Sequence, residues 1–393
     1  MRVSEYLYHL LKKSQLTGFF VFLLAGCQPQ PDPEQLLIQQ AQTDAAAAVS
    51  LAGRRLAKEE YQSALFWFRQ AGKLGDGNAL EHALQLQQRL EGKLATARWL
   101  ENQEQHKWPV AAVSSKRLAE LGLWRLAAYN ANSESYEAAS GCAVTLQPVA
   151  SQLQGVETWQ ALLQQWQQDE QLQQLPVCYL PLQTVESTEL ACTEQHGQRI
   201  HCNYQPLDNL VAKGKFSQLV VIAGRGSASY NNGVIHLPEQ AGLALLRHEF
   251  MHILGFIDEY VLSAAAATEV CRSNRIRPNL IIGEGSEPLR RYLQHWQLNS
   301  DSVKLTPVST CQALDIPVYR IVAEVNLMQY YETALPSLYY ELMQQILSQP
   351  QQLMPVQYYF AYLARQRQDW PAWQQFMQQA AGQGYADAEQ ALQ

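Results

Sequence analysis

The sequence predicts an α+β protein in which a mixed, twisted sheet and one functional helix form a central domain between two helical segments. Three observations support this class. Ala- and Gln-rich stretches at both ends have the composition of helices, short β-rich runs lie between them, and six of the seven cysteines fall in the central part. With 393 residues and 47% hydrophobic content, the chain is long enough for two or three domains.

The first 26 residues have the layout of an export signal. Basic residues precede an apolar run, 16–24, that is too short to span a bilayer. The run closes with Leu24-Ala25-Gly26-Cys27, which resembles a bacterial lipobox. The resemblance implies that residues 1–26 are removed as a lipoprotein signal peptide and that Cys27 carries the lipids. Gln28, in place of Asp, favours the outer membrane, with the protein facing the periplasm or the cell surface.

A membrane-anchored protein of the bacterial cell envelope is therefore expected, with residues 27–34 as a short tether. Three prolines in this segment predict an extended backbone. An uncleaved anchor helix and a plain secretory signal remain alternatives. The net charge of −7, without a basic patch, gives no reason to expect nucleic acid as a partner.

The segments 35–138 and 336–393 predict helical, repeat-like structure. The same pattern of aromatic and small residues occurs in both, at Tyr61, Trp67, Ala71, Gly75 and Ala79 and again at Trp370, Phe376, Ala380, Gly384 and Ala388. Small residues four apart let two helices approach closely, and the glycine permits a turn between them. Both segments resemble single Sel1-like or tetratricopeptide repeat units. They are expected either to dock on the central domain as scaffold or to bind a protein partner.

The segment 139–335 predicts the central domain. β-rich runs indicate strands at 176–180, 218–223 and 233–237. Gly224-Arg225-Gly226 lacks the G-x-x-x-x-G-K-[ST] pattern of a phosphate loop and is interpreted as an ordinary loop. These elements predict a mixed sheet backed by helices, with a helix after the strand at 233–237 and its first turn near Pro238.

That helix carries the most specific signal in the chain. The H-E-x-x-H pattern at His248, Glu249 and His252 puts two imidazoles on one helix face, one turn apart, with a carboxylate beside them. This is the spacing that a zinc ion requires. The alternative is a surface helix that carries these residues by chance. A separate apolar stripe on the same helix, which provides a core face, argues against it.

A third ligand is expected from the residues after the helix. Gly255 is placed to end the helix in a left-handed turn and to return the chain toward the metal. Asp258 or Glu259 would then complete the coordination of Zn²⁺ by the two histidines.

The six cysteines beyond Cys27 predict disulfides, because an even number in an exported chain indicates an oxidising compartment. Cys192 and Cys202 flank a run that predicts a hairpin loop, so these two are paired first. Six cysteines allow 15 pairings, and the sequence does not choose among them, but Cys142–Cys178 and Cys271–Cys311 are the other two pairs that we favour. A second zinc site made of thiolates is the alternative, but no C-x-x-C spacing occurs.

The pattern from His248 to Asp258 resembles the metzincin zinc signature, with aspartate in place of the third histidine as in snapalysin-like bacterial metallopeptidases. Within 139–335, the resemblance covers residues 215 to 335 and implies a zincin-like catalytic domain. It also implies a methionine turn at Met328 and a catalytic tyrosine near the metal, Tyr330. The Asp-Glu-Tyr triplet and Asn-Leu-Met-Gln are similar to IgA-cleaving metallopeptidases as well. There the triplet lies one residue later, so Glu259 remains the alternative third ligand.

The implied activity is a lipid-anchored zinc endopeptidase, in which Glu249 is the general base for a zinc-activated water. The strand at 233–237 is expected to pair with an extended protein or peptide substrate. Two alternatives remain. One is an envelope lipoprotein that binds a protein partner through its helical flanks and has a structural or vestigial zinc site. The other is a zinc hydrolase that cuts peptide crosslinks of the cell wall.

Overall fold

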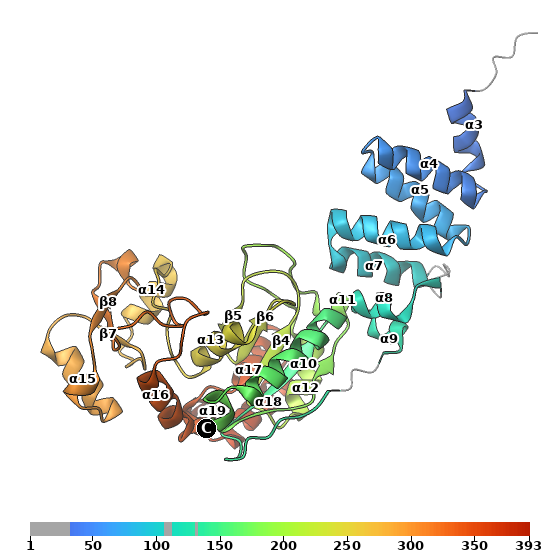
Figure 1. The fold of residues 1–393 in the computed structure, drawn as a ribbon. Helices are drawn as coiled ribbons and strands as arrows, with labels where there is room; N and C mark the ends of the chain where they lie inside the picture. The colour runs from blue at the N-terminus through green and yellow to red at the C-terminus, as the bar shows by residue number, and fades with distance from the viewer. Residues whose placement is uncertain (1–31, 106–111, 130–132) are drawn as a thin grey trace, which may run out of the picture. The chain divides into compact units, whose positions relative to one another are not determined.

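The computed structural model describes residues 32–105, 112–129 and 133–393 (Figure 1). The predicted signal peptide, the lipidation site Cys27 and most of the tether lie outside this part of the chain. No helix in the described ranges is both long and apolar enough to span a membrane. The chain forms two compact units. The first contains the described residues up to Leu90 together with Ala112, and the second contains the rest from Glu91 onward.

The first unit is built from helices that pack in sequence order. They are α3 (Pro33–Gln40), α4 (Ala45–Ala57), α5 (Tyr61–Lys73) and α6 (Gly77–Glu91). Asp32 caps α3 by accepting a hydrogen bond from the Glu34 backbone N–H at 3.1 Å, and Pro33 occupies the first turn. The extended tether expected to reach residue 34 therefore ends earlier, because its last residues form a helix start.

The two repeat-like patterns form helix pairs around a glycine turn, as expected. Helices α5 and α6 are joined through Gly75, and α18 (Trp370–Gly382) and α19 (Ala386–Ala391) are joined through Gly384. Both glycines have positive φ, at 99° and 80°. The alanines that follow the same spacing are buried, so each pair packs through its small residues: Ala71, Ala79, Ala380 and Ala388.

The boundary between the units does not fall at residue 138, where the sequence placed the end of the helical domain. Helices α7 (Lys93–Gln105), α8 (Ser115–Glu120) and α9 (Trp124–Ala127) belong to the second unit. Long-range polar contacts explain the difference. The Lys93 ammonium pairs with the Glu239 carboxylate at 2.6 Å, and the Trp124 indole N–H donates to the Val185 carbonyl at 3.0 Å.

The main sheet of the second unit is mixed. Among the described residues it has six strands: β1 (Val144–Ala150), β2 (Val177–Tyr179), β3 (Gln183–Thr184), β4 (Gln218–Ile222), β5 (Ser229–Asn231) and β6 (Val234–Leu237). Their order is β2-β1-β4-β6-β5, and β3 also pairs with β1. All pairs are parallel except β5 with β6. The predicted α+β class with a mixed sheet is confirmed.

The strand predicted to receive a substrate is β6, and the structure corrects that role. Strand β6 pairs with β4 on one side and with β5 on the other, so both of its edges are occupied. The outer strand of the sheet at this end is β5. The prediction was wrong because the turn at Asn231-Asn232-Gly233 connects β6 to a strand before it, and this short strand has no strong hydrophobic pattern.

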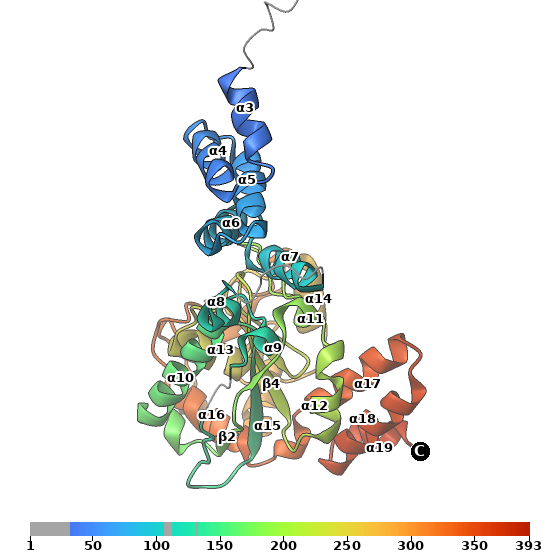
Figure 2. The same ribbon diagram turned by 90° about the vertical axis from the view of Figure 1, so that its right-hand side faces the viewer.

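Helices cover both faces of this sheet (Figure 2). On one face, Leu219 and Val221 of β4 pack with residues of α12 (Asp208–Lys213), α17 (Val356–Gln366) and α18. Alternation along β4 turns Val220 and Ile222 to the opposite face. That face is covered by α10 (Leu153–Gln168) and α13 (Leu243–Ile253), and the Trp166 ring meets Phe250 of α13 with centroids 5.4 Å apart.

The C-terminal helices are part of the second unit and not a separate flank. The Val356 N–H donates to the Ser217 carbonyl at 2.8 Å, and the Gln357 amide donates to the Phe216 carbonyl at 2.7 Å. Val356 and Phe360 are fully buried in the same core as the main sheet. The scaffold interpretation of this segment, which is helical as predicted, is supported by this packing.

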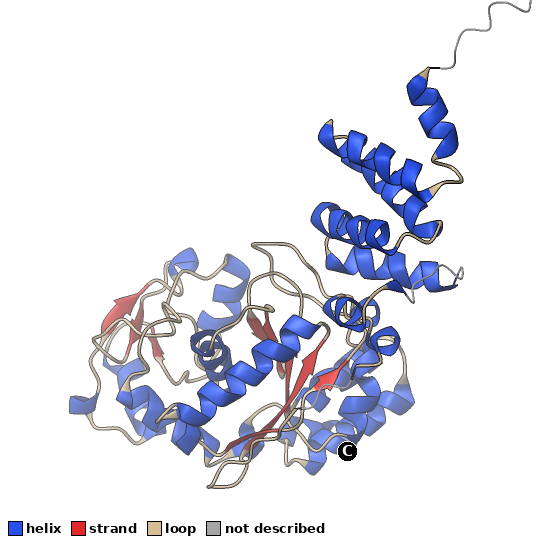
Figure 3. Ribbon diagram, turned by 45° about the vertical axis from the view of Figure 1, so that its right-hand side comes forward, coloured by secondary structure: helices blue, strands red, loops and turns tan. Residues whose placement is uncertain are grey.

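A second, smaller sheet lies apart from the main one (Figure 3). Its strands are β7 (Leu280–Ile282), β8 (Thr306–Val308) and β9 (Val318–Arg320), in the antiparallel order β7-β9-β8. Helices α14 (Ala264–Cys271) and α15 (Ser286–Trp296) belong to this region, which separates α13 from the predicted methionine turn in the sequence.

Three disulfides join the pairs predicted from the sequence. They are Cys142–Cys178, Cys192–Cys202 and Cys271–Cys311, with Cα separations of 5.4, 4.0 and 6.2 Å. The Thr193 N–H donates to the His201 carbonyl at 2.9 Å, which closes the predicted hairpin loop beside the second disulfide. Since all six cysteines are oxidised, they provide no thiolate zinc site.

Candidate metal centre

Helix α13 carries His248, Glu249 and His252 as predicted, but it begins at Leu243 and not near Pro238. It ends at Ile253, and Gly255 follows with φ of +85°. The Gly255 N–H donates to the His252 carbonyl at 3.1 Å. This left-handed turn, which only glycine adopts without strain, sends the chain back past the helix end as the sequence predicted.

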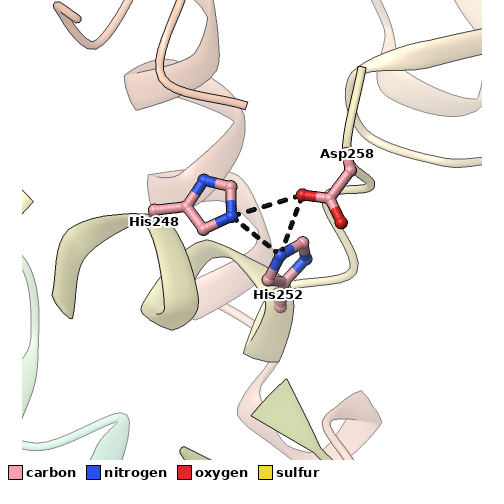
Figure 4. Close-up of side chains that lie close together, drawn as sticks. All are labelled: His248, His252 and Asp258. Carbon is pink, nitrogen blue, oxygen red and sulfur yellow. Dashed lines mark hydrogen bonds and ion pairs between the residues drawn. The ribbon is translucent and has the colours of Figure 1, made fainter. Parts of the chain in front are cut away.

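Asp258 returns to the two histidines (Figure 4). Its Oδ1 atom lies 3.2 Å from His248 Nε2 and 3.3 Å from His252 Nε2, and the two Nε2 atoms are 3.3 Å apart. His248 is buried, and the other two side chains are largely so. Three potential ligand atoms therefore form a nearly equilateral triangle, which identifies these residues as a possible metal-binding group.

Backbone carbonyls fix the orientation of both imidazoles. His248 Nδ1–H donates to the Leu327 carbonyl, and His252 Nδ1–H donates to the Phe256 carbonyl, each at 2.8 Å. A neutral imidazole that donates from Nδ1 presents an unprotonated lone pair at Nε2. Both lone pairs therefore face Asp258 Oδ1. Either a metal ion or a proton at this point relieves the repulsion that three acceptor atoms would otherwise have at such short range.

The size of the triangle matches zinc. Zinc binds histidine nitrogen and carboxylate oxygen at about 2.0–2.1 Å, so two ligands of a tetrahedral site lie about 3.3–3.4 Å apart. The observed edges are 3.2, 3.3 and 3.3 Å. Two imidazoles and one carboxylate are also the donor types of catalytic zinc sites that keep a fourth position open.

The charges in the cluster favour a bound cation. Burial alone would raise the pKa of the Asp258 carboxyl, but the imidazoles of His252 and His248 outweigh it and hold that pKa well below its usual range. Burial alone would lower the pKa of the His252 imidazole. The Asp258 carboxylate outweighs burial and raises this pKa to about 9. The carboxylate is therefore ionised and pairs with positive charge at this point.

Glu249 lies beside the triangle, buried and with one free oxygen. Its Oε2 atom has no hydrogen-bond partner among the described residues. Burial raises the pKa of the Glu249 carboxyl, although the neighbouring His252 and His248 partly oppose the shift. A carboxylate with a raised pKa is suited to accept a proton from water and return it near neutral pH.

Glu259, the alternative third ligand, faces away from the histidines into a buried network. Its carboxylate accepts hydrogen bonds from the amides of Asn279 at 3.1 Å and Asn326 at 2.9 Å, and from the Tyr339 hydroxyl at 2.5 Å. The Arg320 guanidinium lies 3.7 Å from it. With both oxygens bonded elsewhere, Glu259 holds the surrounding segments together, and Asp258 is the residue that faces the two histidines.

Met328 lies in a buried turn that this network supports. The Met328 N–H donates to the Asn326 side chain at 2.9 Å, and the Met328 carbonyl accepts from the Glu259 N–H at 2.9 Å. The preceding carbonyl, that of Leu327, accepts the proton of His248. The predicted methionine turn is therefore connected directly to the ligand residues.

Tyr330 is not joined to the centre in the structure. Its side chain is 57% exposed, and none of the hydrogen bonds in the described part of the chain links its hydroxyl to Glu249 or to the three ligand residues. Tyr260 is the phenol whose electrostatics couple to the site, since burial and the Asp258 carboxylate both raise the pKa of its hydroxyl. The sequence contained a signal for Tyr260, because it ends the Asp-Glu-Tyr triplet.

Comparison of the chain with protein-family models, with curated proteins and with solved structures gave no match. The function of the centre is therefore inferred from its geometry.

Proposed function

We propose that the protein is a zinc-dependent endopeptidase with His248, His252 and Asp258 as metal ligands. The observation that carries this proposal is the triangle of Nε2, Nε2 and Oδ1 atoms, whose edges of 3.2–3.3 Å match tetrahedral zinc. The free Oε2 of Glu249 beside it supports a catalytic rather than a structural site. A structural zinc site is usually closed by four protein ligands and needs no adjacent base.

Each residue has a definite part in this mechanism. Zinc, when bound, would polarise the substrate carbonyl and lower the pKa of a water molecule toward about 7. Glu249 accepts the proton of that water and delivers it to the leaving amine. The Leu327 and Phe256 carbonyls accept the Nδ1 protons of His248 and His252 and so turn their Nε2 atoms toward the metal position, and Asp258 supplies the negative charge that would retain the cation.

The proposed substrate is an extended segment of protein or peptide that pairs with β5. This strand lies at the end of the main sheet and packs against α13 (Figure 1). An outer strand offers unpaired backbone groups that bond an extended chain independently of its sequence, so such pairing suits an endopeptidase.

Export and lipid anchoring at Cys27 belong to the same proposal. The three disulfides support an oxidising compartment, and the lipobox-like sequence supports attachment to a membrane of the cell envelope. The substrate would then be a protein or peptide of the periplasm or the cell exterior.

The proposal is tested by comparing hydrolysis of an unfolded protein by the wild type and by Glu249→Gln, both produced from residue 28 onward. Glu249→Gln is expected to retain zinc and to lose about 10²–10⁴-fold in rate, because it removes the proton acceptor and leaves the ligands intact. Glu284→Gln, at an exposed glutamate, is the matched control. A zinc-loaded wild type that cleaves no peptide bond, or Glu249→Gln with full activity, contradicts the proposal.

A further inference from the structure

The third ligand residue lies on a segment without regular secondary structure. Asp258 follows the end of α13 and precedes α14, in neither helix nor strand. The two histidines are held by the helix itself, but nothing in the local sequence holds an aspartate on such a segment. Because the parts of a functional site must keep their places within about 0.5 Å, the residues that fix this backbone belong to the site.

One buried side chain holds the residues on both sides of Asp258. The Asn279 side-chain oxygen accepts from the Ile257 N–H at 2.9 Å, and its amide group donates to the Ile257 carbonyl at 2.7 Å. The same amide group donates to Glu259 Oε1 at 3.1 Å. Asn279 is fully buried. It therefore bonds the Ile257 backbone as a neighbouring strand would, and it also holds the residue that follows Asp258.

A second buried side chain fixes the backbone of Asp258 itself. The Thr310 hydroxyl donates to the Asp258 carbonyl at 2.9 Å, and the Thr310 carbonyl accepts from the Leu262 N–H at 3.3 Å. Thr310 is also fully buried. Its neighbour Cys311 is joined by a disulfide to Cys271 of α14, so Thr310 is covalently tied to the same region through the next residue.

Both side chains come from the region of the small sheet. Asn279 immediately precedes β7, Thr310 follows β8, and β9 pairs with both strands. The same region reaches the methionine turn, because the guanidinium of Arg320, the last residue of β9, donates to the Gln329 side chain at 2.9 Å. The small-sheet region therefore supports the third ligand and the methionine turn together.

We propose that Asn279 and Thr310 are positioning residues, which hold the backbone around Asp258 so that its carboxylate faces His248 and His252. The inference rests on the proposed zinc site and extends it, since it gives the small-sheet region a part in metal binding. Hydrogen bonds from the second sphere orient the ligands of other metal sites, and their removal costs about 10–100-fold in metal affinity or activity.

The test measures zinc affinity by competition with a chelator in Asn279→Leu, which removes the amide and keeps a similar volume. We expect the affinity to fall about 10–100-fold. Gln357→Leu is the matched control, because Gln357 is also a fully buried amide and donates to the Phe216 carbonyl at 2.7 Å in the core of the main sheet. Both variants should unfold at a lower temperature without metal, but only Asn279→Leu should bind zinc more weakly.

Thr310→Val is a second, milder variant, because it keeps the shape of the side chain and removes the hydrogen bond to the Asp258 carbonyl. It should also bind zinc more weakly than Gln357→Leu, and it decides the question if Asn279→Leu does not fold. If the wild type binds zinc and both variants bind it as tightly as Gln357→Leu, the positioning role is overturned while the zinc site stands. If the wild type binds no zinc, the proposed zinc site fails and this inference fails with it.

Discussion

Asp258 and Glu259 are adjacent carboxylates with different roles. The offset from His252 allows either to be a ligand, so the sequence left both open. The choice depends on where the partners of Glu259 lie, namely at Asn279, Asn326 and Tyr339 on three separate segments. These contacts form only in the folded chain. Sequence spacing therefore predicted that His248 and His252 lie together with Glu249 beside them, but not which of the two neighbouring carboxylates faces the histidines.

Replacing Glu259 should mainly lower stability, whereas replacing Asp258 should mainly abolish zinc binding. Glu259→Ala removes the centre of a buried network and leaves polar partners unsatisfied, so we expect it to lower the free energy of unfolding by about 3–5 kcal/mol. Asp258→Ala should leave the metal-free protein folded, because its histidines can release their protons, and should abolish zinc binding. Urea unfolding and zinc titration measure the two effects. Loss of zinc in both variants with no loss of stability in Glu259→Ala would contradict these roles.

Local signals predicted the end of α13 better than its start. Gly255 adopts the left-handed turn that its position indicated. Pro238 and Glu239, which were predicted to form the first turn, lie outside the helix, which begins at Leu243. The Glu239 carboxylate instead pairs with Lys93 at 2.6 Å. A glycine turn depends on its own backbone, whereas the residues before α13 make a contact with a lysine 146 residues away that the sequence does not reveal.

The packing of the β5–β6 turn against the C-terminal helices gives a prediction for Gly233. This residue has φ of +90°, and a Cβ atom there would lie 2.6 Å from the Val356 Cα atom. Backbone strain and overpacking should together cost Gly233→Ala about 2–4 kcal/mol of stability. Gly382→Ala, in helix α18 with open space around it, is the control and should cost nothing. Equal unfolding midpoints for the two variants would show that this contact is not tight.

At the scale of the whole molecule, sequence patterns predicted the fold class, the disulfide pairs and the helical ends. They did not predict which helices join the central domain, and they left open whether the end segments dock on it or bind a partner. Amphipathic periodicity shows that a helix has a buried face but not which element covers it. Val356 and Phe360, for instance, look like ordinary helix residues and are buried against the main sheet.

This shared core contains a histidine that should make stability depend on pH. His236 of β6 is buried, and its Nε2 atom contacts the Tyr204 hydroxyl. Burial lowers its pKa from 6.5 to about 4. Between about pH 6.5 and pH 4 this histidine is therefore protonated in the unfolded chain but neutral in the folded chain. The free energy of unfolding is highest above about pH 6.5 and decreases as the pH falls toward 4.

The expected loss from this one group is about 2 kcal/mol between pH 7 and pH 5. Urea unfolding at both pH values should show a smaller difference for His236→Gln, which does not titrate, than for the wild type. His295→Gln, at an exposed histidine, should retain the wild-type difference. An identical pH dependence of stability in all three proteins would show that His236 does not cause the loss.

We propose that this chain binds one catalytic zinc ion, and metal analysis of the purified protein is the direct test. The protein from residue 28 onward should contain about one zinc per chain after dialysis, and His252→Ala, which removes one of three ligands, should contain none. A folded wild type that holds no zinc, or a His252→Ala variant that holds as much as the wild type, would show that His248, His252 and Asp258 do not form a zinc site.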